Sequence, residues 1–191
     1  MSHTKEKILS AGARLVREKG FNHTGLHEVL KEAGVPKGSF YFHFENKESF
    51  GLALLDVYIS FFETEMNRIM LDKSKSGLVR LKGFLDFFKR TLMKEQFIGG
   101  CPLGNLAQEM GDINEKFRKK IALGLEKIES KILGCLQDSQ DAGEIPDSID
   151  TNSAAAFILN SWEGAIVRVK VEKSIQPLEL LDDFIFNKIL K

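Results

Sequence analysis

Between Thr24 and Phe44 two short apolar segments flank a glycine, and this stretch constrains the fold more than any other part of the sequence. Apolar residues at helical spacing precede Gly34, which can adopt the positive φ that ends a helix. Pro36 fits the first turn of a following helix, where its missing N–H would have no partner. The stretch therefore predicts two helices joined by a tight turn, which is a helix-turn-helix.

The second of these helices carries side chains that can donate hydrogen bonds to phosphates or base edges. Phe40 and Phe44 lie four residues apart on it, so we expect them to be buried together. The opposite side would then remain open to a partner, and we interpret this helix as the one that reads DNA. Its polar side chains are Lys37, Ser39, Tyr41 and His43.

The composition indicates a folded globular chain. With 191 residues, 43% of them hydrophobic, it is long enough for one or two domains with a buried core. No window approaches the roughly 18 uninterrupted apolar residues of a membrane span, and the N-terminus lacks the apolar region of a signal peptide. We therefore expect a cytoplasmic protein without a membrane partner.

The charge pattern limits how such a chain can hold DNA. The formal net charge is zero, whereas most dedicated nucleic-acid-binding domains are basic. Residues 1–50 hold 8 Lys and Arg against 6 Asp and Glu, and the remainder holds 19 against 21. DNA binding would then depend on a few well-placed cations rather than on bulk charge.

Cysteines and histidines do not predict a metal site. Cys101 and Cys135 are too few for a disulfide framework, and neither has a Cys or His beside it at metal-ligand spacing. His23 and His27 lie four residues apart, but no carboxylate or thiol completes a ligand set. We expect neither a metal nor a cofactor.

The rest of the chain is predicted to be helical, and the absence of a βαβ alternation indicates an all-α fold. A long helix capped by Asn46 would link a small N-terminal unit to a larger one. Residues 167–172 alternate in β-branched side chains, but a lone strand would have no partner, so we favour a helix there. The predicted helices span residues 4–19, 24–34, 36–44, 46–71, 78–93, 105–110, 112–140, 151–173 and 177–189.

Residues 33–50, together with Lys19-Gly-Phe and Thr24, resemble the signature of TetR-family transcriptional regulators. Residues 99–107 are similar to a glycine-rich segment in one branch of that family. The resemblance implies a DNA-binding domain over residues 1–47 and an effector-binding and dimerisation domain over residues 48–191. It also implies a homodimeric repressor that binds a palindromic operator in double-stranded DNA and releases it when a small molecule enters the C-terminal domain.

Carried over by position, the resemblance implies DNA contacts for seven residues. Lys37 and Gly38 would open the recognition helix in the major groove, and the absence of a Cβ at Gly38 would let the helix lie close to the groove floor. Phosphate contacts are implied for Tyr41, His43, Lys47 and Thr24, and Ser39 belongs to the same surface.

Three positions depart from the family pattern. Phe42 stands where a Tyr is common, so a phosphate-binding hydroxyl is absent there. Gly25 replaces the usual Ser or Thr cap, and Leu30 occupies a helix-crossing site that usually holds Ala. These departures affect backbone contacts and helix crossing rather than the fold.

The resemblance further implies an apolar effector cavity with a few polar anchors. Cys101 precedes a short helix whose dipole can lower a thiol pKa, so it is either a sensor of electrophiles or oxidants or a plain packing residue. The residues expected to line the cavity are Phe62, Met66, Phe87, Cys101, Asn105 and Trp162.

An apolar seam runs along the helix predicted from residue 151, at steps of three and four, and a second apolar face begins beside it. A helix that is apolar on two sides usually has neighbours on both. We expect this seam and the last helix to form a four-helix dimer interface with a second copy. Its predicted residues are Leu159, Trp162, Ile166, Val169, Leu181 and Phe184.

Two other functions compete with a repressor. One is an enzyme that uses the C-terminal cavity, but no histidine lies beyond position 43 and no catalytic constellation is recognisable, so we expect no enzymatic activity and no catalytic residues. The other is a helical ligand-binding or adaptor protein that has kept the fold but does not bind DNA.

Overall fold

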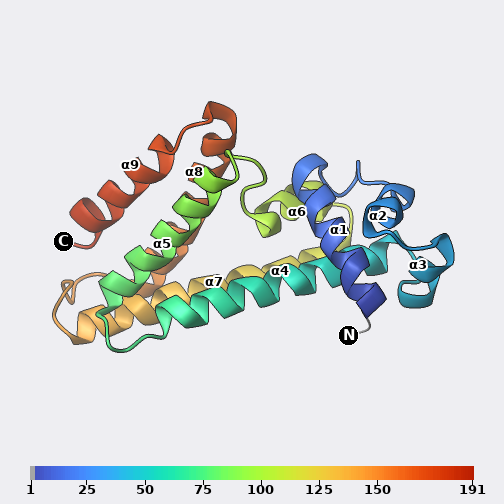
Figure 1. Ribbon diagram of the computed structural model, residues 1–191. Coiled ribbons are helices and arrows are strands. Elements are labelled where there is room, and N and C mark those ends of the chain that lie inside the picture. The colour runs from blue at the N-terminus through green and yellow to red at the C-terminus, as the bar shows by residue number, and fades with distance from the viewer. Residues whose placement is uncertain (1–2) are drawn as a thin grey trace. The chain divides into compact units, whose positions relative to one another are not determined.

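The computed structural model describes residues 3–191, and within them every regular element is a helix (Figure 1). The predicted all-α class is confirmed, and the strand alternative for residues 167–172 is wrong because they continue a long helix. The elements are α1 (His3–Lys19), α2 (Leu26–Ala33), α3 (Lys37–His43), α4 (Lys47–Met70), α5 (Gly77–Lys94), α6 (Pro102–Met110), α7 (Glu115–Asp141), α8 (Thr151–Glu172), α9 (Gln176–Phe184) and the π-helical turn η1 (Ile185–Ile189).

The chain divides into two compact units that do not follow the sequence order. The first unit comprises the residues up to Ser60 together with residues 102–124, and the second comprises residues 61–101 and 125–191. The first unit thus contains the predicted DNA-binding segment, residues 1–47, and adds residues 48–60 and 102–124 to it. Helices α4 and α7 contribute to both units.

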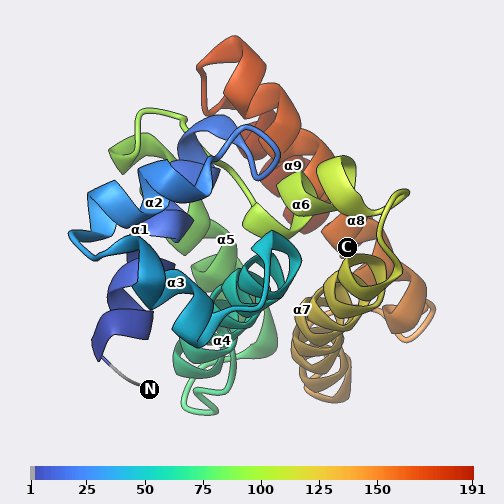
Figure 2. The same ribbon diagram turned by 90° about the vertical axis from the view of Figure 1, so that its right-hand side faces the viewer.

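Three phenylalanine rings form the centre of the helix-turn-helix region, where α1, α2 and α3 lie close together (Figure 2). Phe40 and Phe44 are buried with ring centroids 5.2 Å apart, and both rings pack against Phe50. A side chain at Gly12 would collide with the Phe50 ring. The predicted joint burial of Phe40 and Phe44 is therefore confirmed.

Helix α7 completes the first unit from the middle of the sequence. The Phe117 ring lies 5.3 Å from the Phe21 ring, and Glu48 accepts hydrogen bonds from the Asn114 amide and the Lys116 ammonium, each at 2.7 Å. Asn114 also caps α7, because its Oδ1 accepts from the backbone N–H groups of Lys116 and Phe117. The helix predicted to open at residue 112 therefore begins later, at Glu115.

Asparagine also caps the start of α4, as predicted. The Asn46 side chain accepts from the Ser49 backbone N–H at 2.9 Å, and the Ser49 hydroxyl accepts from the Asn46 N–H at 3.2 Å. The pair is a reciprocal capping arrangement that fixes where α4 begins. The first predicted helix, by contrast, starts at residue 4, whereas α1 already includes His3.

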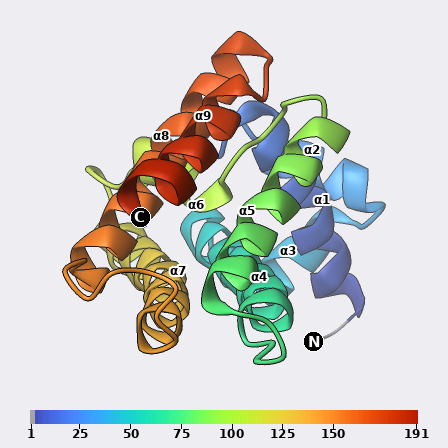
Figure 3. The ribbon, with the colours of Figure 1, turned by 90° about the vertical axis from the view of Figure 1, so that its left-hand side faces the viewer.

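Figure 3 shows helices α5, α8 and α9 of the second unit. Buried aromatic side chains form much of the core of this unit. Trp162 packs against Phe84 and Phe88, and the Phe88 ring stacks on Phe62 with centroids 5.1 Å apart. Helices α8 and α9 lie side by side, and the Lys89 ammonium of α5 pairs with Asp182 of α9. Burial of this aromatic surface stabilises the unit.

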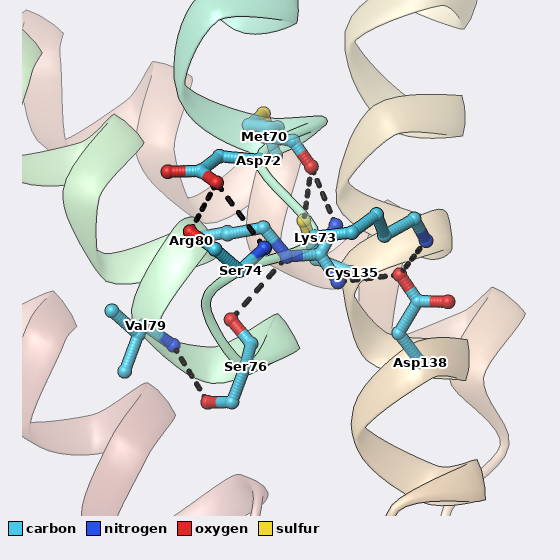
Figure 4. A network of polar contacts seen from close by, with 9 residues as sticks. All are labelled: Met70, Asp72, Lys73, Ser74, Ser76, Val79, Arg80, Cys135 and Asp138. Atoms are coloured by element: carbon cyan, nitrogen blue, oxygen red, sulfur yellow. Dashed lines mark hydrogen bonds and ion pairs between the residues drawn. The ribbon is translucent and has the colours of Figure 1, made fainter.

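A buried arginine fixes the turn between α4 and α5 (Figure 4). The Arg80 guanidinium donates to the Met70 carbonyl at 2.6 Å and to the Ser76 carbonyl at 3.3 Å, and it pairs with Asp138 of α7. The Lys73 ammonium pairs with the same Asp138 carboxylate, so this one carboxylate joins the turn to α7. These ion pairs hold the pKa of Asp138 below its usual range.

Candidate nucleic-acid interface and effector site

Gly34 forms the turn of the helix-turn-helix. It has the left-handed conformation, with φ 64°, and its backbone N–H donates hydrogen bonds to the Leu30 and Lys31 carbonyls of α2. Pro36 then precedes α3 in an extended conformation. Gly25 stands at the start of α2 without a side-chain cap, as the sequence indicated. The predicted turn at Gly34 is confirmed.

Helix α3 presents most of its predicted DNA-contacting residues to solvent. Lys37 and Gly38 are exposed at its start, Tyr41 is 60% exposed, and Ser39 and His43 are partly exposed. Only Phe40 of this helix is buried. The folded chain thus gathers a cation, two hydroxyl groups and an imidazole on one short helix whose other side anchors it.

Thr24 does not fit the role that the resemblance implied. Its side chain is only 1% exposed, and its hydroxyl donates to the Gly20 carbonyl at 2.7 Å. The hydroxyl therefore closes the loop between α1 and α2 rather than facing outward. We correct the prediction that the Thr24 side chain contacts a phosphate.

Lys47 is held against the same loop. Its ammonium donates to the Asn22 carbonyl at 3.2 Å and lies 5.0 Å from the centre of the Phe21 ring. Partial burial lowers the pKa of Lys47, and the nearby Glu109 carboxylate acts in the opposite direction. An ammonium has three donors, so this placement is compatible with a phosphate contact as well.

Glu109 is a residue of this region that the sequence patterns did not reveal. From α6 its two carboxylate oxygens accept from the backbone N–H groups of Phe21 and Asn22, at 3.0 and 2.9 Å. These residues are 88 and 87 positions away in the sequence, so no local motif could indicate the contact. Glu109 fixes the loop that leads into α2.

Four of the residues predicted for the effector cavity lie in the interior of the second unit. Phe62, Met66, Cys101 and Trp162 are buried there. Phe87 is only partly buried and lies under the Arg68 guanidinium. Asn105 belongs to α6 in the first unit, whereas the other five belong to the second.

The interior of the second unit also contains polar atoms without a protein partner. The Trp162 indole Nε1 and the Glu163 Oε1 are buried and make no hydrogen bond within the described chain. Burial raises the pKa of Glu163, and a hydrogen bond from the Cys101 thiol partly offsets that effect. Glu163 is therefore the interior polar group closest in chemistry to a ligand anchor. Sequence analysis missed it because a glutamate in a helix is usually exposed to solvent, and no local pattern indicates that this one is buried.

The two cysteines lie in different surroundings. Cys101 is buried next to the Glu163 carboxyl. Cys135 contacts the Met70 carbonyl in the arginine network, and burial raises its pKa to about 11. Cys135 is thus an unreactive reference thiol within the same chain.

Most of the residues predicted for the dimer interface are buried inside the single chain. Leu159, Trp162, Ile166 and Val169 are buried within the single chain, as is Leu181 of α9, because α5 and the neighbouring elements already cover them. Side chains that fill a chain's own core cannot contact a second copy. Phe184 alone among the predicted interface residues is exposed.

A different surface of α8 and α9 is open and apolar. Phe157, Leu180 and Phe184 are each about half exposed or more, and they line a groove of about 290 Å³ with Ala165 and Arg168. Ser161 and Gly164 on the same helix have short side chains or none, so another helix could approach closely. We call this surface the α8/α9 groove.

Two observations concern other kinds of site. No helix within residues 3–191 is long and apolar enough to span a bilayer. The same residues contain no cluster of three His, Cys, Asp or Glu side chains with the placement of metal ligands.

Known proteins resemble this chain over nearly its whole length. The transcriptional regulator AcuR of Cereibacter sphaeroides is 36% identical over 173 residues, which cover 91% of this chain and 79% of AcuR. The crystal structure of regulatory protein TetR from Rhodobacter sphaeroides has 34% identity and a TM-score of 0.92, covering 97% of this chain and 98% of that one. The reduced form of Escherichia coli NemR has 28% identity and a TM-score of 0.86, covering 97% and 96%.

Two family models match separate parts of the sequence. Residues 8–54 match the model described as "Bacterial regulatory proteins, tetR family", which covers α2, α3 and the turn at Gly34. Residues 77–184 match the model described as "Tetracyclin repressor-like, C-terminal domain" and make up more than half of the chain. The helix-turn-helix geometry and both matches agree, and the chain belongs to the TetR family of bacterial transcriptional regulators.

Proposed function

We propose that this protein is a homodimeric repressor that holds a palindromic operator through α3 and releases it when a small molecule binds the second unit. The exposed face of α3 supports this proposal most directly. It presents Lys37, Tyr41 and His43 beside a glycine, while Phe40 anchors the helix. The related protein NemR is named a transcriptional repressor.

The DNA-binding part of the proposal can be tested by gel shift and footprinting on the DNA that flanks the protein's own gene. We expect specific, salt-sensitive binding that Lys37→Ala weakens. Each lost phosphate contact should reduce the slope of log K against log salt by about 0.9. Lys94→Ala, which removes an exposed lysine from the end of α5, is the matched control and should leave the slope unchanged. Absence of any sequence-specific binding would contradict the proposal.

For the homodimer we propose the α8/α9 groove as the contact surface. Apolar side chains exposed on two adjacent helices are typical of a surface that another protein covers. Leu180 is 61% exposed in the groove, so Leu180→Glu should convert the dimer to a monomer in analytical ultracentrifugation. Val171→Glu changes an even more exposed residue that does not line the groove and should leave the dimer intact. The reverse pattern would place the interface elsewhere.

We propose that the effector acts by a population shift. Two recognition helices of a dimer fit successive major grooves only when they lie about 34–36 Å apart. An effector that binds more tightly to a dimer with another spacing favours that form, which binds the operator poorly. The largest possible loss of operator affinity equals the ratio of the effector's affinities for the two forms. The aromatic interior with Phe62, Trp162 and Glu163 has the mixed apolar and polar character of a ligand site.

An electrophile is the second candidate effector, and Cys101 favours it. Its thiol directly precedes the N-terminus of α6, where a helix dipole favours a thiolate, and a relative's structure is described as a reduced form. We expect N-ethylmaleimide to label Cys101 faster than Cys135 in the folded protein and to weaken operator binding. Cys101→Ser should bind the operator normally and resist the reagent. Equal labelling rates at the two thiols would exclude a sensor role for Cys101, without affecting the DNA-binding proposal.

A further inference from the structure

Phe42 has the largest exposed fraction, 84%, among the large apolar side chains of residues 3–191. Isolated exposed apolar residues are common on protein surfaces. Phe42 is not isolated, however, because Tyr41 beside it is 60% exposed and both belong to α3. Together they form an aromatic patch on the helix that carries the DNA-contacting residues.

The ring of Phe42 has a defined neighbour. It packs edge-on against the His43 ring, with centroids 4.9 Å apart and an angle of 83° between the planes. This contact limits the rotamers that the phenyl ring can adopt. A side chain that is already oriented loses less conformational entropy when it binds.

Gly38 lies one helical turn before Phe42 on the same side of α3. The two positions therefore face the same partner, with Gly38 nearer the start of the helix. A Cβ at Gly38 would meet no atom within 4 Å, whereas one at Gly51 would collide with the Phe21 and Phe117 rings. Gly38 also lacks the positive φ that requires glycine at Gly34. Nothing within the folded chain therefore demands a glycine at position 38, and an external partner can approach α3 closely there.

The chemistry of the phenyl ring narrows what that partner group can be. The ring has no donor or acceptor, so it cannot hydrogen-bond a phosphate or a base edge. The only apolar group that base pairs display in the major groove is the thymine C5 methyl. Building on the proposed function, we propose that Phe42 contacts a thymine methyl in each operator half-site and thereby selects thymine at that position.

The proposal can be tested by removing single methyl groups from the DNA. Operators are first selected from random-sequence duplexes with the full-length protein, and each thymine of a half-site is then replaced by deoxyuridine. A replacement in only one of the two half-sites should weaken binding about fourfold, the factor expected from burying one methyl group. The symmetric double replacement should weaken it by about fifteenfold, since the two contacts are independent.

Protein variants then assign the methyl effect to Phe42. Phe42→Ala should bind the thymine and deoxyuridine duplexes equally, while Phe42→Tyr, which keeps the ring, should still distinguish them. Ile113→Ala removes another exposed apolar side chain of the first unit and should discriminate like the unchanged protein. Because Phe42 is exposed, the thermal unfolding of Phe42→Ala should match that of the unchanged protein.

Two outcomes would overturn the proposal. If Phe42→Ala weakens binding to the thymine and deoxyuridine duplexes by the same factor, the ring packs on the sugar–phosphate backbone instead. If no deoxyuridine replacement weakens binding by the unchanged protein, the protein does not contact a thymine methyl group. Failure of the selection to yield any operator would instead contradict DNA binding itself, so the two failures are distinguishable.

Discussion

Helices α3 and α8 each have one buried and one exposed side, but their exposed sides differ in chemistry. The exposed side of α3 combines a cation, hydroxyl groups and one phenyl ring around Gly38. The exposed side of α8 is apolar around Phe157 and continues onto α9 as the α8/α9 groove. A mixed polar surface is suited to a charged, grooved partner such as DNA, whereas a continuous apolar surface is suited to another protein.

The comparison also separates stability from function. Burial of Phe40 and Trp162 holds α3 and α8 in place, and these side chains have no surface left for a partner. The exposed side chains contribute little to the fold and are available for binding. Substitutions on the buried and exposed sides should therefore have different consequences, and four predictions test this division.

The largest effect is expected on the buried side of α8. Trp162 is 1% exposed and packs on Phe84 and Phe88, so Trp162→Ala should lower the free energy of unfolding by about 3–5 kcal/mol. Urea unfolding at several protein concentrations measures the change. Val171→Ala on the exposed side should change it by less than about 0.5 kcal/mol. A Trp162→Ala protein that keeps its stability but dissociates would place the interface on the seam after all.

A pH-dependent effect is expected at Glu163, next to Trp162. Burial raises its pKa above the ordinary 4.5, so the folded chain retains a proton that the unfolded chain has released. The free energy of unfolding should then fall as the pH rises from about 4.5 to the raised pKa. Glu163→Gln should abolish this fall and be more stable than the unchanged protein at the upper end of the window. Urea unfolding across that range measures the slope of the free energy of unfolding against pH. The exposed Glu179→Gln is the control and should keep the slope of the unchanged protein. Equal slopes for Glu163→Gln and the unchanged protein would mean that Glu163 is solvated.

A smaller loss is expected at the turn before α3. Gly34 has φ 64°, which an L-residue adopts only with strain, so Gly34→Ala should lower the free energy of unfolding by about 1 kcal/mol. Thermal or urea unfolding measures it. Gly134→Ala, in α7 where a Cβ meets nothing within 4 Å, is the matched control and should not destabilise the chain. Equal effects at the two glycines would mean that the turn tolerates a side chain.

The smallest effect on stability, with the opposite sign, is expected at Gly38. A Cβ there meets no neighbour, and alanine favours a helix more than glycine, so Gly38→Ala should raise the free energy of unfolding by about 0.5 kcal/mol. Its operator affinity should nevertheless fall, because the added methyl group holds α3 away from the groove floor. Parallel unfolding and gel-shift measurements check both parts. Unchanged affinity would show that α3 does not approach DNA at Gly38.

Local patterns predicted the helix-turn-helix well, and the reasons are physical. Gly34 and Asn46 mark helix ends through backbone chemistry that acts within a few residues. Phe40 of α3 and Phe44 just after it are four residues apart, a spacing that favours burial of both rings together. Such signals depend on neighbours in the sequence and are therefore visible in it.

The predictions that failed, and the contacts that were not predicted, involve residues whose partners are distant in the sequence or cannot be identified from residue type alone. Periodicity showed that α8 is apolar on more than one side, but it cannot distinguish a neighbour in the same chain from one in a second copy. The Glu109 contact with the loop before α2 joins residues almost ninety positions apart. Thr24 has a residue type suited to phosphate, and only the fold shows that its hydroxyl is used internally.

The discontinuous composition of the first unit has a consequence for protein engineering. A hybrid repressor made by transplanting residues 1–47 would leave behind Glu109 and Phe117, which hold the loop and the Phe21 ring in this chain. Such a graft would carry the reading helix without the parts that position it. Substituting only the outward-facing side chains of α3 within the intact chain would keep those supports. Such substitutions are therefore the better way to redirect the repressor to a new operator.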